Sequence, residues 1–272
     1  MSRMGTGIGA AVALAVLVVL ALTAPEHLAE GNRELAFARP AALPPFGGDQ
    51  LGRPLLQYAQ QGARVVLGPA IAAAILVGVL STMGGLVRCV GDRRVESVIQ
   101  GFSEVLGALP RMVVLLVAAL LIPSGERSLL PLALVWAILA APGAVDEAAA
   151  VAERLGGARF VEALRAHGFS RARVFLYHIV LLNLRPVVVR QSSEVLLQVT
   201  FLELGLSYLA VQDSQSSFTH SDSLKSWADL LYMGYTSIGL GMPTGHALWL
   251  GLGLVAVVTT MAKLTTSMVR AR

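Results

Sequence analysis

The sequence is poor in cysteine and in charge. Its single cysteine, Cys89, leaves no possible disulfide within the chain. Charged residues make up only 14% of its 272 residues, against about 25% in a typical soluble domain. Hydrophobic residues make up 55%, which is more than the interior of a compact soluble fold of this length can hide. The composition excludes a cytosolic enzyme, a disordered chain and a secreted disulfide scaffold, and it predicts a polytopic membrane protein.

Lysines and catalytic motifs are also scarce. The only lysines, Lys225 and Lys263, lie outside any G-x-x-x-x-G-K-[ST] phosphate-binding loop. The five histidines form no H-E-x-x-H pair, and a lone cysteine offers no cysteine pair for zinc. His178 is best explained by a structural hydrogen-bonding role. His220 is better explained as part of a flexible outer loop than as a weak metal contact. We therefore predict no enzymatic activity, no metal site and no cofactor in this chain.

Six stretches are long and apolar enough to cross a membrane, because a spanning helix needs about 20 residues at a rise of about 1.5 Å each. The first stretch could be a cleaved signal peptide, but its apolar run is longer than that of a typical signal sequence and favours a retained anchor. The prediction is an all-α membrane protein. The six expected spans cover residues 5–24, 64–87, 98–122, 128–145, 186–207 and 245–263.

Basic residues set the orientation of these spans. With a cytoplasmic N-terminus, fourteen of the 21 Lys and Arg residues fall on the inner side and six on the outer side, while Arg111 lies within a span. Because cytoplasmic loops are enriched in Lys and Arg, both termini are predicted to be cytoplasmic. Topology then explains the net charge of +4, and no nucleic-acid partner is needed. Residues 1–62 become an anchor helix with an extracytoplasmic segment, and residues 63–265 a helical core domain.

The largest predicted cytoplasmic segment, residues 146–185, is too polar to span and too long for a simple connection. Residues 148–167 are rich in Ala, Leu, Glu and Arg, which are good helix formers. The following Gly168-Phe169-Ser170 is typical of a helix stop followed by the N-cap of a second helix. We therefore expect a helix–turn–helix on the cytoplasmic face.

Five short motifs stand in order along the chain. Residues 160–170 read FVEALRAHGFS and are followed by His178-Ile179 and by Pro186. This pattern resembles the EAA loop of ABC-importer permease subunits, in the second-permease type of the dipeptide/oligopeptide/nickel branch. The chain departs from that branch at Leu164, at 180–182 (VLL in place of L-P-N) and in the long polar stretch 212–226. The other four motifs that resemble the branch are 45–53 (PFGGDQLGR), 104–110 (EVLGALP), 203–209 (ELGLSYL) and 226–227 (SW).

The resemblance implies a type I ABC importer permease fold in the bacterial inner membrane, with a cytoplasmic coupling helix in an EAA-type loop at 146–185. The implied partners are a homologous second permease, two ABC ATPase subunits, an extracytoplasmic solute-binding protein and the lipid bilayer. ATP and Mg would bind to the partner ATPases, since this chain has no phosphate-binding loop. The chain would form half of a pathway for di- or oligopeptides. Matched position by position, Glu162, Ala163 and Gly168 are the expected ATPase-coupling residues.

Charged residues at membrane depth are candidates for function because they are costly to place there. The predicted depths allow Arg111 in the third span to form a buried ion pair with Glu194 in the fifth. The alternative is that each contacts the second permease or lies in water. Gln191, Glu194 and Gln198 share one helical face, and this polar stripe is the best candidate for the lining of the pathway.

Other functions remain open at this point. An ABC permease for nickel or another small solute would share the same motifs. A secondary transporter or channel would work without an ATPase, but should show inverted repeats or broken helices, and the large cytoplasmic loop would have no explanation. A membrane-embedded enzyme would need convergent catalytic groups, which the sequence does not show.

Overall fold

The computed structural model describes residues 3–90, 93–122, 128–156, 159–170, 173–174, 177, 184–212, 225–241 and 245–270. Within these residues the chain is all-helical, as predicted, with nine α-helices and no β-sheet. A short 3-10 helix, Arg33–Leu35, lies in the segment after the first helix. The α-helices are α1 (Arg3–Leu22), α2 (Leu55–Val90), α3 (Arg93–Ala108), α4 (Arg111–Leu121), α5 (Leu129–Gly156), α6 (Arg159–Ala166), α8 (Arg185–Gln212), α9 (Trp227–Gly239) and α10 (His246–Arg270).

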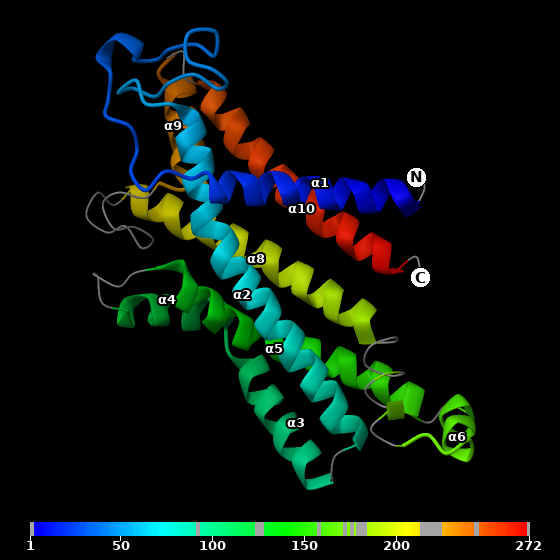
Figure 1. Ribbon diagram of the computed structural model, residues 1–272. Helices are drawn as coiled ribbons and strands as arrows, with labels where there is room; N and C mark the ends of the chain where they lie inside the picture. Colours follow the sequence, from blue (N-terminus) through cyan, green and yellow to red (C-terminus); the bar gives the residue numbers. More distant parts are fainter. Residues whose placement is uncertain are drawn as a thin grey trace.

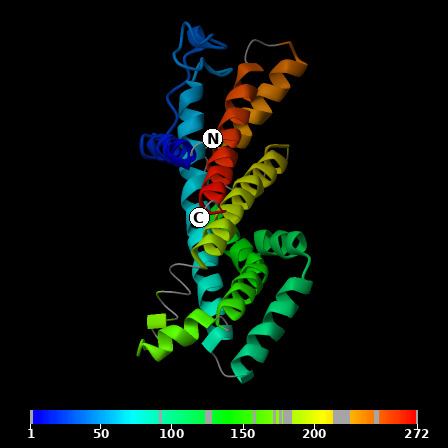
Figure 2. The same ribbon diagram turned by 90° about the vertical axis from the view of Figure 1, so that its right-hand side faces the viewer.

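Helix α2 is the long axis of an elongated bundle (Figures 1 and 2). Helices α5 and α8 pack along it, and α10 packs against α8, α9 and α1. Helix α1 crosses α2 and α10 rather than running alongside them (Figure 1). The segment between α1 and α2 gathers with α9 at one end of the bundle, whereas α6 lies at the other end (Figure 1).

Small residues bring α2 and α5 close together. Ala70 and Ala73 on α2 and Ala137 on α5 are fully buried in one apolar cluster. Farther along α2, a Cβ on Gly84 would overlap the Cγ1 of Val145. Such close approach of helix backbones through Gly and Ala is typical of packing inside membranes, where the hydrophobic effect does not hold helices together.

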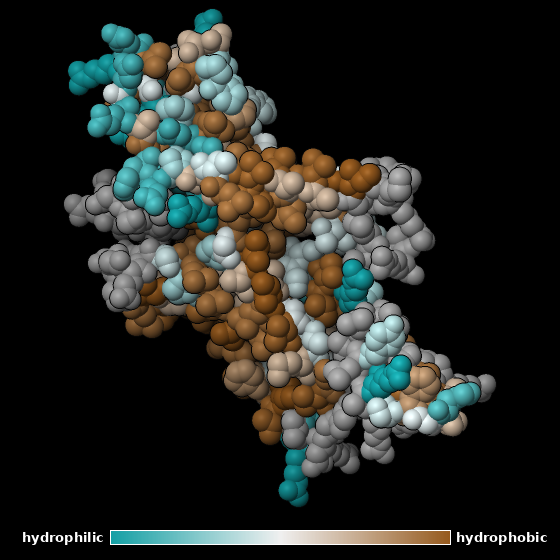
Figure 3. Space-filling model, viewed as in Figure 1, coloured by the Kyte–Doolittle hydropathy of each residue, from teal (hydrophilic) through white to brown (hydrophobic). Residues whose placement is uncertain are grey.

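Three helices are long and apolar enough to span a membrane, and the bent pair α3–α4 would make a fourth if it counts as one span. The three are Leu55–Val87, Leu129–Leu155 and His246–Ser267. The apolar part of α1, Ile8–Leu22, is shorter, and α8 carries four charged residues within its 28. Hydrophobic side chains cover the middle of the molecule in Figure 3, with hydrophilic ones at the upper end. The architecture is that of a possible multi-pass membrane protein, and six spans stay a prediction.

The third predicted span, 98–122, is not one straight helix. It breaks between Ala108 and Arg111 into α3 and α4, whose axes differ by 83°. Pro110 lies at the break with φ of −69°. Proline has no N–H to continue the helical hydrogen bonds, and its ring clashes with the preceding turn. The depth assigned to Arg111 along a straight span therefore does not apply.

Two other helices differ from expectation. The helix expected at 148–167 is divided, because α5 continues to Gly156 and α6 then begins at Arg159. Helix α9 lies where only an outer loop was expected. Its start is a capping box, in which Ser226 Oγ accepts a hydrogen bond from the N–H of Ala228 (3.1 Å) and Asp229 Oδ2 accepts one from the N–H of Ser226 (2.7 Å). This S-x-x-D pattern is the signal that sequence reasoning missed.

Candidate functional site

Helix α6 ends in a sharp turn at Gly168, which has φ of +80°. The N–H of Phe169 donates to the carbonyl of Leu164 (3.1 Å), and the N–H of His167 donates to that of Ala163 (3.0 Å). This is the Schellman arrangement, with glycine as the left-handed residue beyond the helix. A Cβ at Gly168 would meet nothing within 4 Å. Backbone conformation alone therefore requires glycine here.

The chain beyond Gly168 turns into a new N-cap. Ser170 Oγ accepts a hydrogen bond from the N–H of Arg173 (3.3 Å), and the N–H of Val174 donates to the Ser170 carbonyl (3.1 Å). The guanidinium of Arg173 lies over the Phe169 ring, 5.0 Å from its centre, where a cation–π contact helps hold the turn. The predicted helix stop and N-cap are confirmed. Most of the segment predicted to form the second helix, including His178 and residues 180–182, lies outside the described residues.

The two other expected coupling residues are accessible on α6. Glu162 and Ala163 are both exposed, and α6 lies beyond the end of α5, away from the centre of the bundle (Figure 1). The Nδ1 of His167 lies 2.8 Å from the Ala163 carbonyl, so this ring closes the last turn of the helix. The short helix α6 and the turn at Gly168 thus form a compact, exposed projection.

A polar network joins α5 and α8, the two helices that flank this projection in the chain. Glu147 Oε2 on α5 accepts hydrogen bonds from Arg190 Nη2 and from Gln191 Nε2, both on α8. The Nε of Arg190 lies 3.7 Å from Glu194 Oε1, one turn farther along α8. The side chains of Arg190 and Glu147 are 32% and 29% exposed. One carboxylate therefore fastens the beginning of α8 to the end of α5.

The predicted polar stripe on α8 makes most of its contacts with α5. Gln191 bonds to Glu147, and Gln198 Oε1 accepts a hydrogen bond from Trp136 Nε1 (2.9 Å). Only Glu194, with a side chain 49% exposed, turns toward open space. Two of the three residues thus hold helices together in this conformation, and a role in lining the pathway stays a prediction.

Arg111 and Glu194 form no ion pair within the described residues. Glu194 lies beside Arg190 instead. The reason is local: Arg111 is the first residue of α4, immediately after the break at Pro110, and its side chain is exposed. The break removes the straight-helix geometry on which the proposed pairing depended.

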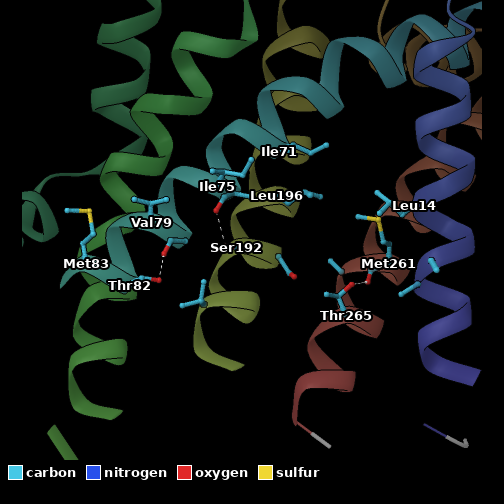
Figure 4. Close-up of a pocket in the computed structure, with 17 residues that line it drawn as sticks. Leu14, Ile71, Ile75, Val79, Thr82, Met83, Ser192, Leu196, Met261 and Thr265 are labelled. Carbon is cyan, nitrogen blue, oxygen red and sulfur yellow. Dashed lines mark hydrogen bonds between the residues drawn. The ribbon is translucent and has the colours of Figure 1, made fainter. Parts of the chain in front are cut away.

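The largest cavity described is an apolar groove of about 900 Å³ between α1, α2, α8 and α10 (Figure 4). The hydroxyls along its wall are satisfied locally. Ser192 donates to the Ala74 carbonyl (2.9 Å), and Thr82 donates to the Gly78 carbonyl (2.7 Å). Because these groups have their partners, the groove suits apolar chains rather than a polar solute.

No protein-family model matches this chain, and no curated protein matches it either. The five motifs therefore carry the resemblance to ABC permeases by themselves. Groups of three or more possible metal ligands do not occur among the residues that the structure covers. The projection at α6 combines exposure, a special backbone conformation and charge.

The network predicts a measurable contribution to stability. Replacing Glu147 with glutamine should lower the free energy of unfolding by about 1–2 kcal/mol, because hydrogen bonds to charged groups contribute about 1.5–3 kcal/mol and these side chains are partly exposed. The matched control, Glu194→Gln, should cost less than about 1 kcal/mol, since it weakens only a half-exposed pair on one helix. Thermal unfolding in detergent, followed by circular dichroism, compares the two. Equal shifts for both variants would contradict a special role for Glu147.

Proposed function

We propose that this chain is the permease subunit of an ATP-driven ABC importer for small peptides, forming half of the transmembrane pathway. In this proposal it pairs with a homologous permease in the bacterial inner membrane, two ABC ATPases bind on the cytoplasmic side, and a solute-binding protein delivers substrate from outside. The observation that carries the proposal is the exposed helix α6 with its glycine turn, at the position of the EAA-like motif.

The arrangement of the helices supports the proposed topology. Helix α6 lies at one end of the bundle, whereas the start of α1 and the end of α10 lie beside its middle (Figures 1 and 2). The segment between α1 and α2 and helix α9 lie toward the opposite end (Figure 1). The coupling helix is expected on the cytoplasmic side and the segment between α1 and α2 on the outer side, so their separation agrees with the distribution of basic residues.

The proposed mechanism uses α6 as the element that receives force. When ATP binding closes the ATPases, they press on α6, whose exposed Glu162 and Ala163 form the contact. The turn at Gly168 passes this motion to the segment leading into α8. Because Glu147 fastens α5 to α8 through Arg190, the two helices move together, and the cavity between the permeases opens outward. ATP hydrolysis then resets the assembly.

Purification of the full chain from its native membranes tests this function. The wild-type chain should bring with it a P-loop ATPase, identified by mass spectrometry and by vanadate-sensitive ATP hydrolysis. Glu162→Lys should remove most of this ATPase, because it reverses a charge in the proposed contact. The control Glu30→Lys makes the same charge change on an exposed residue of the opposite end and should retain the ATPase. Retention of the ATPase by Glu162→Lys would refute the proposed contact.

A secondary transporter is the second candidate, because one observation favours it. The break of 83° between α3 and α4 is the kind of discontinuous helix that such transporters use at their binding sites. Reconstitution of the purified chain alone into liposomes separates the two. Substrate uptake driven by an ion gradient, without ATP or any ATPase, would favour this candidate and refute the ABC permease.

A further inference from the structure

A polar cavity of about 260 Å³ lies at the end of the molecule opposite α6. Three segments form it: the turn at residues 49–53, the start of α2 with Tyr58, and the stretch from Lys225 into α9. Charged side chains of both signs line it, with Asp49 and Asp229 opposed by Arg53 and Lys225. A charged group that is removed from water is costly unless it has an ion-pair or hydrogen-bond partner, so each of these charges should have one.

The acidic groups already have partners within the fold. Asp49, only 3% exposed, accepts hydrogen bonds at Oδ1 from the N–H groups of Leu51 (2.8 Å) and Arg53 (2.7 Å). Its Oδ2 accepts one from the Tyr58 hydroxyl (2.7 Å). Asp229 caps α9 through the N–H of Ser226. Both carboxylates therefore act in holding the turn and the helix start in place.

The basic groups have fewer partners: the Arg53 side chain interacts with the Tyr58 hydroxyl. Arg53 Nε is buried and meets no hydrogen-bond acceptor among the described residues. Lys225 forms no ion pair within that part of the chain either. A buried donor without an acceptor is rare in folded proteins and indicates a partner supplied from outside, such as water or a ligand. The groups in the cavity that could still bind a ligand are therefore the positively charged side chains of Arg53 and Lys225, which favour an anion.

The cavity wall is rigid before any ligand arrives. Gly52 has φ of +74°, and a Cβ there would overlap the carbonyl oxygen of Asn32. Gln61, which is 0% exposed, donates to the Pro25 carbonyl (3.2 Å) and accepts from the N–H of Lys225 (3.0 Å). These contacts fix the backbone beside Arg53 and at Lys225, and such preorganisation reduces the entropy lost on binding.

We propose that this cavity binds the carboxylate of a small solute through Arg53 and Lys225. Arginine and lysine form strong charge-assisted hydrogen bonds with carboxylates. A cavity of about 260 Å³ has room for the carboxylate end of a small solute. The ligand class is a short peptide or another small carboxylic acid. The site goes beyond the proposed function, because binding here requires neither ATP nor a partner chain.

Calorimetric titration of the purified full chain in detergent tests this site with three probes. Dialanine and N-acetyl-dialanine both carry the carboxylate and should bind. Dialanine amide lacks the carboxylate and should show no saturable binding. Arg53→Gln and Lys225→Gln should each weaken N-acetyl-dialanine binding by roughly tenfold, the loss expected for one hydrogen bond to a charged group. Arg39→Gln, which removes an exposed arginine outside the cavity, should bind like the wild type.

The outcomes separate clearly. Equal binding of the amide would overturn the proposal, as would an absence of saturable binding by the two carboxylates. Unchanged affinity in both Arg53→Gln and Lys225→Gln would also overturn it. Because Arg53 lies in a tight turn, its variant is checked by circular dichroism, and Lys225→Gln decides the result if the first variant unfolds. Retention of the ATPase by Glu162→Lys, which would refute the proposed ATPase contact, leaves this binding test unaffected, so the two proposals fail separately.

Discussion

Replacing Trp227 with alanine is expected to lower the free energy of unfolding by about 3–5 kcal/mol, the range seen for large buried aromatic residues. Trp227 begins α9, is 0% exposed and is the largest fully buried side chain described. Its Nε1 donates to the Ala59 carbonyl on α2 (3.0 Å). Removing the ring should leave a cavity and remove this hydrogen bond, and should loosen α9 from α2. Thermal unfolding in detergent, followed by circular dichroism, measures the loss.

The same contact can be tested from the side of α2. A Cβ on Gly62 would overlap the Trp227 ring and lie 2.8 Å from its backbone nitrogen, so Gly62→Ala should cost about 1–3 kcal/mol through overpacking. Gly68, on the same helix, has nothing within 4 Å of such a Cβ. Gly68→Ala should instead stabilise the protein by up to about 1 kcal/mol through helix propensity. If Gly62→Ala were as stable as Gly68→Ala, this close packing would be disproved.

Apolar length was enough to locate most helices but not their ends. Five of the six predicted spans correspond to single helices, because long apolar runs have few alternatives to helix in a chain this poor in charge. Helix α2 nevertheless begins at Leu55, well before the predicted residue 64. Its first turns contain glutamines whose partners lie far away in sequence, such as Gln57, which accepts a hydrogen bond from the N–H of Ala29. Hydropathy alone cannot detect a polar helix start whose side chains find their hydrogen-bond partners only in the folded protein.

Local signals predicted part of the candidate site. The turn at Gly168 and the N-cap at Ser170 depend on neighbouring residues only, and both were found as expected. The bond between Glu147 and Arg190 joins residues 43 apart, and it depends on how α5 and α8 pack. Sequence spacing favoured Arg111 as the partner of Glu194 because it assumed straight helices. Local chemistry was therefore predictable, whereas pairing between helices required the three-dimensional structure.

Replacing Gly168 with valine is expected to abolish substrate uptake while the fold is retained. The backbone there has φ of +80°, a conformation that costs a residue with a Cβ roughly 1–2 kcal/mol and is least favourable for β-branched side chains. The turn should relax to another conformation and move α6 relative to the segment leading into α8. No neighbour would clash with the new side chain, so the bundle should stay folded. Uptake of a labelled dipeptide by cells, with unfolding of the purified variant measured in parallel, checks both expectations.

Gly241 provides the matched control, because it also has a positive φ, +67°, and a Cβ there would meet nothing within 4 Å. It follows α9, at the end of the molecule opposite α6. Gly241→Val should therefore carry a similar backbone cost and retain uptake. If both variants lost uptake equally, general strain would explain the loss and the turn at Gly168 would have no special part in coupling. Uptake lost only in Gly168→Val, with the ATPase still bound, would show that the turn transmits force. That role would then be distinct from attachment of the ATPase at Glu162.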